Sequence, residues 1–428
     1  MLRWVLVMLL VLGAARVATP AAARGADRPL TPGLTDQADE FAAIDAHALA
    51  APTSVCTSVA PLAACVTQAA QNEREKARAI FRWVTANIAY DISAAALSDN
   101  PEVVLARRRG VCYGYAVLFK ALAEAAGLKT EVIIGHSSKF KPSEGDERDD
   151  WLNHAWNAVE IAGRWQLLDC CWGAGYLDEQ RRFVRRFTPH YFLTAPDVFV
   201  CDHFPENPRW QLLDPPIAKD EYLQRVQLRP PFFECGLRLV SHHSAVIEAD
   251  DSLAVTIDAP PESALTAVLY RDGRQLKDGC TFTQRDATGY VIHSRFPAAG
   301  AYVLRVFARR ADTPGDEYGW ALDYAIRARS AAVGGAGFPK AYGSFLTRNC
   351  RVERALSKVL RAGDAVDFSI TAPSAEDVVV ATGGAFVHLP AQGPGFSGKV
   401  PVSPGPVVIF AKFPDRSAYE GLLQYTAQ

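Results

Sequence analysis

The segment "GVCYGYAVLFKALAEAAG", residues 110–127, decides the fold because it places a cysteine at the start of a predicted helix. We expect the helix to run from Cys112 to Ala126, with Gly127 at its C-cap. Its buried side recurs at helical spacing through Val117, Leu118, Ala121, Leu122 and Ala125. A thiol at this place is a nucleophile, half of a disulfide, or a packed core side chain.

A second segment, "NHAWNAVEIAGRWQLLDC" at residues 153–170, has the pattern of an antiparallel hairpin. Two runs with strand character, 153–161 and 164–170, flank the dipeptide Ala162-Gly163, which is typical of a tight turn. The turn sets the register of the two strands, and the register decides which side chains share a face.

In this register His154 lies opposite Cys171, and Asp169 is its diagonal neighbour on the same face. A carboxylate there can hydrogen-bond the imidazole and stabilise its protonated form, while the other ring nitrogen addresses a thiol. We therefore predict that Cys112 is a nucleophile, His154 its base and Asp169 the residue that orients the base.

Each of these three residues also has a structural interpretation. Cys112 could be a packed thiol, His154 a core histidine with satisfied hydrogen bonds, and Asp169 a carboxylate that caps a turn at the end of a strand. Taken singly, each structural interpretation is favoured. Taken together, the three lie on the elements that a nucleophile, a base and an orienting group require, which favours the catalytic hypothesis.

The flanking sequence predicts an α+β core around these residues. Residues 73–91 carry apolar side chains at helical spacing, and residues 129–135 form a short run rich in β-branched residues. The order is therefore a helix, the cysteine helix, and then antiparallel strands.

The same segments resemble the transglutaminase-like superfamily of papain-type thiol enzymes, most closely the kyphoscoliosis peptidase type. The resemblance covers about residues 73–215 and rests on "FRWVTANIAYD" (81–91), residues 110–127, "NHAWNAVEIAGRWQLLDCCWGAG" (153–175), "YFLT" (191–194) with Pro196, "HFP" (203–205) and "WQLL" (210–213). It implies a papain-like core and the roles given above for Cys112, His154 and Asp169. One departure is Cys170-Cys171, where the family usually has a Val-Thr pair.

After about residue 230 the helical periodicity stops and short alternating strands follow. "AVTIDAP" (254–260) and "DFSITAP" (367–373) align at an offset of 113 residues, which indicates an internal repeat. We expect two β-sandwiches of the Ig-like kind, joined near the glycine-rich segment 330–339. The predicted organisation is a signal peptide (1–23), a leader with a helical extension (24–72), the transglutaminase-like core (73–230) and two sandwiches (231–330 and 331–428).

The first residues have the layout of a secretory signal peptide. Arg3 precedes an apolar run over residues 4–12, and Ala21 and Ala23 form a cleavage site before Arg24. The run is too short to span a bilayer comfortably, so we expect a secreted or periplasmic protein with no membrane span after cleavage.

All nine cysteines lie beyond this segment, and an odd number leaves at least one thiol unpaired within the chain. Cys56 and Cys65 are the favoured disulfide pair. A second hypothesis is that Cys112 and Cys171 form a disulfide that silences the enzyme until it is reduced. The alternative is that Cys171 is packed, or bridged to a distant cysteine such as Cys201.

The formal net charge is −2 and no basic stripe occurs, which argues against a nucleic-acid partner. We expect no cofactor and no metal. The favoured function is an exported cysteine peptidase or amidase that acts on protein or peptide substrates, which could come from the cell envelope. The alternatives are acyl transfer of the transglutaminase type and a non-catalytic surface or periplasmic interaction protein, with the β-sandwiches binding a protein or glycan.

Overall fold

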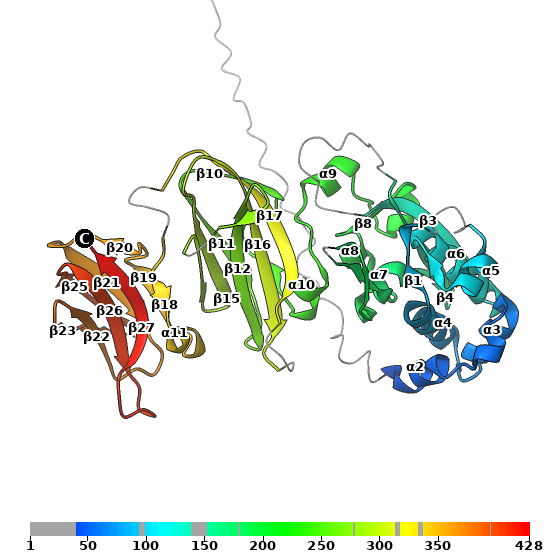
Figure 1. Ribbon diagram of the computed structural model, residues 1–428, viewed down its shortest axis with the longest axis horizontal. Helices are drawn as coiled ribbons and strands as arrows, with labels where there is room; N and C mark the ends of the chain where they lie inside the picture. The colour runs from blue at the N-terminus through cyan, green and yellow to red at the C-terminus, as the bar shows by residue number, and fades with distance from the viewer. Residues whose placement is uncertain are drawn as a thin grey trace, which may run out of the picture. The chain divides into compact units, whose positions relative to one another are not determined.

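The protein is described by a computed structural model over residues 40–93, 99–137, 152–178, 180–276, 279–312, 317–332, 337–393 and 395–428 (Figure 1). The expected signal peptide lies outside these residues. Among the described helices, none has the length and apolar character needed to cross a membrane.

The first part of the described chain is helical. Its helices are α2 (Ala42–Leu49), η1 (Thr53–Val55), α3 (Val59–Val66), α4 (Glu73–Asn87), α5 (Pro101–Arg107) and α6 (Cys112–Ala125). The helix α4 ends four residues before the predicted end, because Ala89–Tyr90 instead forms the strand β1, which pairs in parallel with β2 (Arg109–Gly110). The cysteine helix α6 begins at the predicted residue.

Side-chain contacts fix the start and the face of α4. Asn72 caps the helix by accepting a hydrogen bond from the Glu75 N–H at 2.9 Å, which satisfies one of the four orphan donors of a helix N-terminus. Arg78 is buried and makes two hydrogen bonds with Asp45 of α2, at 2.7 and 2.8 Å. A buried charge needs such a partner, so this pair ties α2 to α4.

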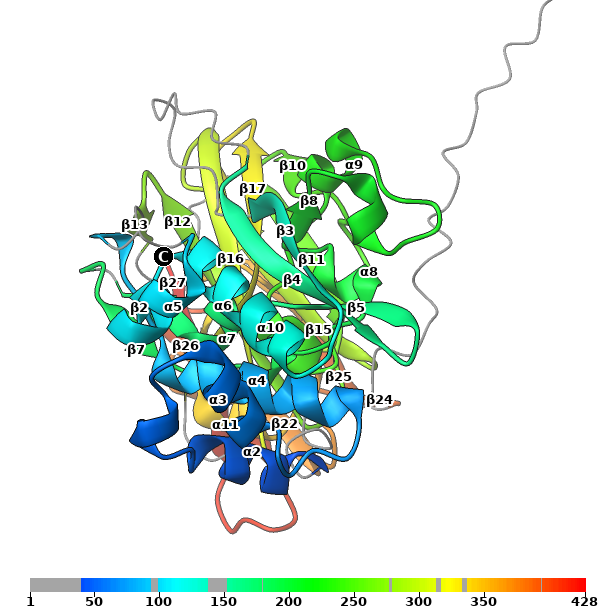
Figure 2. The same cartoon turned by 90° about the vertical axis from the view of Figure 1, so that its right-hand side faces the viewer.

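The central sheet has the strand order β5-β4-β3-β8, all antiparallel. Its strands are β3 (Thr130–Ser137), β4 (His154–Ile161), β5 (Arg164–Leu168) and β8 (His203–Pro205). The pairing of Asn157 with Leu168 and of Ile161 with Arg164 confirms the predicted hairpin register. The helix α6 packs on β3 and β4, beside which it lies in Figure 2.

The second hairpin strand ends earlier than predicted. The strand β5 stops at Leu168, and Asp169 becomes the N-cap of the short helix α7 (Cys170–Ala174). This helix packs closely on α4, since a Cβ atom at Gly173 would lie 2.6 Å from the Phe81 ring. The prediction that Cys171 lies opposite His154 in the sheet is therefore wrong: Cys171 belongs to α7.

Short elements complete this part of the chain. They are β6 (Gly175–Leu177), β7 (Phe183–Arg185), η3 (Pro189–Tyr191), α8 (Pro196–Phe199), η4 (Pro208–Gln211) and α9 (Lys219–Gln224). Gly135 of β3 has no room for a side chain, because a Cβ atom there would lie 2.4 Å from the Phe204 carbonyl oxygen and from the Trp156 ring. Because Gly135 has no side chain, β8 can approach β3. This approach positions His203, the first residue of β8.

The chain from residue 230 to its end forms two β units, each with its own apolar core. The first has the sheets β10-β17-β16-β12-β13 and β14-β15-β11-β9, and the second has a sheet containing β18, β27, β26, β22, β23 and β20 and a sheet β19-β21-β25-β24. Their elements are α10 (Pro230–Glu234), β9 (Arg238–Leu239), β10 (Val246–Ala249), β11 (Ser252–Asp258), β12 (Ser263–Arg271), β13 (Arg274–Gln275), β14 (Thr281–Arg285), β15 (Gly289–Arg295), β16 (Gly300–Arg310), β17 (Gly319–Ala328), β18 (Lys340–Ala341), α11 (Gly343–Thr347), β19 (Arg351–Arg354), β20 (Val359–Leu360), β21 (Ala365–Thr371), β22 (Asp377–Thr382), β23 (Ala385–His388), β24 (Ala391–Gln392), β25 (Gly395–Pro401), β26 (Gly405–Lys412) and β27 (Glu420–Ala427).

The two units repeat one another as the sequence predicted. The strands β11 and β21 have bounds that differ by 113 residues, and so do the short helices α10 and α11. Inward-facing residues of both sheets of the first unit, such as Ile257, Leu304 and Tyr324, are fully buried. This is the arrangement of a β-sandwich.

All nine cysteines lie in the described part of the chain, and none of them forms a disulfide. The predicted Cys56–Cys65 disulfide is therefore not formed. The Cys56 thiol instead donates a hydrogen bond to the Pro52 carbonyl at 3.3 Å, and Cys65 lies in the helix α3.

Candidate active site

Cys112 is the first residue of α6, directly after the extended residue Val111. Its side chain is partly exposed. Its thiol lies close enough to the His154 imidazole and the backbone N–H of Ala155 for both to lower its pKa. Donors beside a sulfur favour the thiolate over the neutral thiol.

His154 is the first residue of β4, and its ring is buried. Its Nε2 atom lies 2.7 Å from Oδ2 of Asp169. An ionised carboxylate can only accept, so Nε2 carries a proton and donates it. The other ring nitrogen, Nδ1, is then the atom that serves Cys112, which matches the predicted division of roles.

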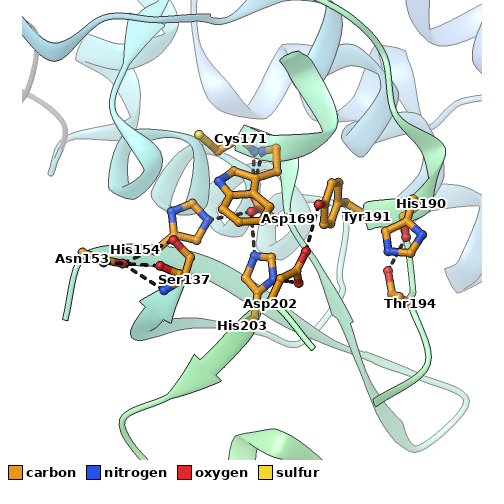
Figure 3. Close-up of polar contacts among 11 residues, drawn as sticks. Ser137, Asn153, His154, Asp169, Cys171, His190, Tyr191, Thr194, Asp202 and His203 are labelled. Atoms are coloured by element: carbon orange, nitrogen blue, oxygen red, sulfur yellow. Dashed lines mark hydrogen bonds and ion pairs between the residues drawn. The ribbon is translucent and has the colours of Figure 1, made fainter. Parts of the chain in front are cut away.

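Asp169 receives four hydrogen bonds, shared equally between its two oxygens (Figure 3). Oδ1 accepts the backbone N–H groups of Cys171 at 2.7 Å and Trp172 at 3.1 Å, which caps α7. Oδ2 accepts from His154 at 2.7 Å and from His203 at 3.0 Å. The two oxygens thus have different partners: Oδ1 caps α7, as the structural interpretation expected, and Oδ2 accepts from two histidines.

The charges of the three predicted site residues support one another. Burial acts to raise the pKa of the Cys112 thiol, but the hydrogen bond and charge of His154 outweigh it, so the pKa is lowered. Burial acts to lower the pKa of His154, but the charge and hydrogen bond of Asp169, with Cys112, raise it to about 10. Despite its burial, Asp169 has a pKa well below its usual range because of His154 and His203. All three shifts act in the direction that favours a thiolate beside an imidazolium.

Sequence reasoning missed two functional candidates at this site, His203 and Asp202. His203 begins β8 and donates to Asp169, while its Nδ1 atom lies 2.5 Å from Oδ1 of Asp202. Tyr191 donates a hydrogen bond to the other oxygen of Asp202 at 3.0 Å. The signal in the sequence was the "HFP" motif, but its spacing from Asp169 gives no hint of the contact.

The same cluster has the geometry of a metal-binding group. Ligand atoms of His154, Asp169 and His203 lie within 4.8 Å of one another, and all three residues are buried. A metal ion binds a bare imidazole nitrogen, whereas Nε2 of His154 and Nε2 of His203 each donate a proton to Asp169, so these residues are not assigned as metal ligands. In the form described here, hydrogen bonds already engage the converging atoms.

Comparison with known families identifies two parts of the chain. Residues 60–170 match the model of the transglutaminase-like superfamily, and residues 219–334 match the model of the KY-like, immunoglobulin-like domain. Both matches confirm the resemblance and the fold class that were predicted from the sequence. The first match includes Cys112, His154 and Asp169.

Several curated proteins are similar over much of the chain. Kyphoscoliosis peptidase from Homo sapiens is 28% identical over 314 residues, which are 72% of this chain and 46% of that protein. The protein of the same name from Mus musculus is 30% identical, covering 63% of this chain and 40% of that protein. Hillarin from Drosophila melanogaster is 31% identical, and the match covers 55% of this chain and 32% of that protein. The matched region thus spans less than half the length of each of these relatives.

Proposed function

We propose that this protein, which combines a transglutaminase-like domain with a KY-like Ig-like domain and has kyphoscoliosis peptidase homologues, is a thiol enzyme that acts on amide bonds. Cys112 is the nucleophile, His154 the general base and acid, and Asp169 the residue that orients His154. The observation that carries the proposal is the hydrogen bond between His154 and Asp169 beside Cys112, whose thiol pKa is lowered by the same imidazole.

The geometry supports a two-step reaction. The Cys112 thiolate attacks the carbonyl carbon of the amide, and the oxygen takes up the negative charge. The backbone N–H of Cys112 belongs to the first turn of α6, whose donors lack intrahelical acceptors, so it can help to bind this oxyanion. When the carbon–nitrogen bond breaks, His154 gives its proton to the leaving amine and a thioester remains on Cys112.

The second step decides the type of enzyme. If water attacks the thioester, His154 accepts a proton from it and the products are an acid and the free thiol, which makes the protein a peptidase or amidase. If a second amine attacks, the product is a new amide, which makes it an acyltransferase. The human and mouse relatives are named kyphoscoliosis peptidase, and on this ground we favour hydrolysis.

The signal-peptide pattern supports export of the enzyme to a secreted or periplasmic location. The substrate is then a protein or peptide of that compartment, and the β-sandwich units are candidates for binding a protein or glycan partner. A non-catalytic interaction protein is the main alternative. It has no need of an activated thiol, so the reactivity of Cys112 separates the two hypotheses.

The test is to trap the acyl-enzyme. The full chain is mixed with an extract of periplasmic or cell-wall proteins, quenched in acid, digested and analysed by mass spectrometry, with Cys112→Ala as the control. We expect a thioester-linked acyl group on the peptide that contains Cys112, and none in the control. An acyl group on another cysteine, or an equal signal in the control, would contradict the proposal. A fluorescent primary amine added to the mixture then reports transfer against hydrolysis.

A further inference from the structure

The side chain behind the site, His203, lies between two carboxylates. Its Nε2 atom is 3.0 Å from Oδ2 of Asp169, and its Nδ1 atom is 2.5 Å from Oδ1 of Asp202. The ring is fully shielded from solvent, so no water competes for either nitrogen. Figure 3 shows the ring aligned with both acceptors.

The hydrogen-bond count determines the protonation state of this ring. An ionised carboxylate accepts and never donates, and a neutral imidazole has only one N–H group. With an acceptor at each nitrogen, both nitrogens must carry a proton, which makes the ring an imidazolium. Burial acts to lower the pKa of His203, but the charge of Asp202 and the hydrogen bonds of both carboxylates raise it overall.

Aromatic rings surround His203 and favour a cation there. Phe199 stacks on it at 4.1 Å between ring centroids, and Trp172 lies 4.7 Å away. Trp156 and Tyr191 approach at 5.0 and 5.8 Å. The face of an aromatic ring attracts a cation, most strongly where water is excluded, and Phe199 presents its face to His203.

We propose that His203 is a positioning residue that, as a doubly protonated ring bridging Asp169 and Asp202, fixes the carboxylate of Asp169 toward His154 and thereby holds Cys112 as a thiolate. This inference rests on the proposed function and extends the triad by a second His–Asp pair. His203 does not touch the sulfur, so its effect passes through Asp169 and His154.

The direction of the effect follows from the charges around the ring. His203 faces Asp202, Asp169 and Tyr191 through hydrogen bonds or ring contacts, and its ring centroid lies 5.3 Å from that of His154. His190 is also close enough to interact with its charge. Removing the cation and its N–H donor takes away one of the four hydrogen bonds of Asp169, so that Oδ2 can shift or take up a proton. Either change weakens the imidazolium of His154, so the Cys112 thiol becomes harder to ionise.

The test compares His203→Met with His203→Gln. Methionine fills the space without a donor, whereas the amide N–H of glutamine can reach the same oxygen of Asp169. His190→Met is the matched control, because His190 is also buried but is not among the hydrogen-bond partners of Asp169. Folding of each variant is checked by circular dichroism. The readout is the pH dependence of iodoacetamide labelling of the Cys112 peptide, measured by mass spectrometry, which requires no substrate.

We expect His203→Met to move the labelling midpoint upward, toward the ordinary thiol value near 8.5, and to lower the rate at pH 6 by about tenfold or more. His203→Gln should restore part of that rate, and His190→Met should label as the wild type does. A folded His203→Met variant with an unchanged midpoint would overturn the inference and leave the proposed function standing. If the wild-type thiol itself labels as an ordinary thiol, the proposed function fails first.

A measurement on the unaltered protein decides the matter if His203→Met does not fold. Nitrogen-15 spectra of the histidine-labelled full chain report which ring nitrogens carry protons. We expect both nitrogens of His203 to be protonated at pH 7 and at pH 8, with the signal assigned by its loss in His203→Gln. A neutral ring with one bare nitrogen at pH 7 would overturn the inference.

Discussion

Two cysteines of this protein begin helices, and their thiols are shifted in opposite directions. Cys112 is the first residue of α6, and burial of its thiol is outweighed by His154, so the pKa is lowered. Cys170 is the first residue of α7, where burial and the negative charge of Asp169 raise the thiol pKa well above its usual value. Position at a helix start is common to both, and only Cys112 has an imidazole partner.

The contrast shows that a helix N-terminus alone does not make a nucleophile. In α7 the backbone N–H groups of Cys171 and Trp172 donate hydrogen bonds to the carboxylate of Asp169, so they do not stabilise a thiolate. That carboxylate therefore has opposite effects on the two thiols. Through His154 it stabilises the thiolate of Cys112, and directly it opposes ionisation of Cys170.

The largest expected effect separates the two cysteines themselves. Cys112→Ala should abolish amide cleavage or transfer, a loss of roughly 10⁵-fold or more, because it removes the sulfur that forms the thioester. Cys170→Ala should fold and keep its activity within about threefold, since Cys170 serves only in packing. The measurement is turnover of the substrate identified by acyl-enzyme trapping. Normal turnover by folded Cys112→Ala would refute the mechanism.

The second largest effect is expected from His154→Ala, because this change leaves Cys112, like Cys170, without an imidazole that lowers the thiol pKa. His154→Ala removes both the base and the cation that lowers the thiol pKa, so the activity should fall by about 10⁴-fold. Labelling of Cys112 at pH 6 should also slow to the rate of an ordinary thiol. Retention of fast labelling at pH 6 in this variant would show that the helix, not the imidazole, activates the sulfur.

A smaller effect is expected from Asp169→Asn. The amide oxygen can still cap α7, which preserves the shape of the site, but the amide lacks the charge and the second accepting oxygen that His154 and His203 use. His154 then loses its preferred tautomer, and we expect a loss of about 10³-fold in turnover. Crystal structures or circular dichroism would verify the fold, and activity within tenfold of the wild type would contradict the assigned role.

The smallest effect concerns Cys171. Its buried position in α7, without a disulfide bond, favours the packed alternative over a disulfide with Cys112. We therefore expect activity to change less than about twofold on adding dithiothreitol, and Cys171→Ser to behave as the wild type does. A gain on reduction that disappears in Cys171→Ser would instead establish the redox switch.

The sequence was sufficient for the parts of the site that obey local rules. The turn at Ala162-Gly163 set the hairpin register, and the alternation of a strand then placed His154 and Asp169 on one face. The cysteine helix and the internal repeat were visible for the same reason, since each depends on a spacing within one segment. These predictions required no knowledge of how distant segments meet.

The other features of the site depend on tertiary contacts, which the spacing of residues along the sequence does not encode. Asp169 leaves the sheet because α7 packs on α4, where Gly173 admits the ring of Phe81. His203 reaches Asp169 because β8 pairs with β3, whose Gly135 leaves room for it. The prediction of a Cys56–Cys65 disulfide is wrong for a similar reason. Closeness in sequence does not align two thiols when one of them is in a helix.

The most direct test of the account is the pH dependence of thiol reactivity in the wild-type protein. The rates of iodoacetamide labelling at Cys112 and Cys170 are measured by mass spectrometry across the pH range, beside turnover. The lowered pKa of Cys112 predicts fast labelling at pH 6, while Cys170 stays inert. Turnover should fall as the pH rises through about 10, because His154 then loses the proton that it gives to the leaving amine. Labelling of Cys112 only as an ordinary thiol, with a midpoint near 8.5, would contradict the account.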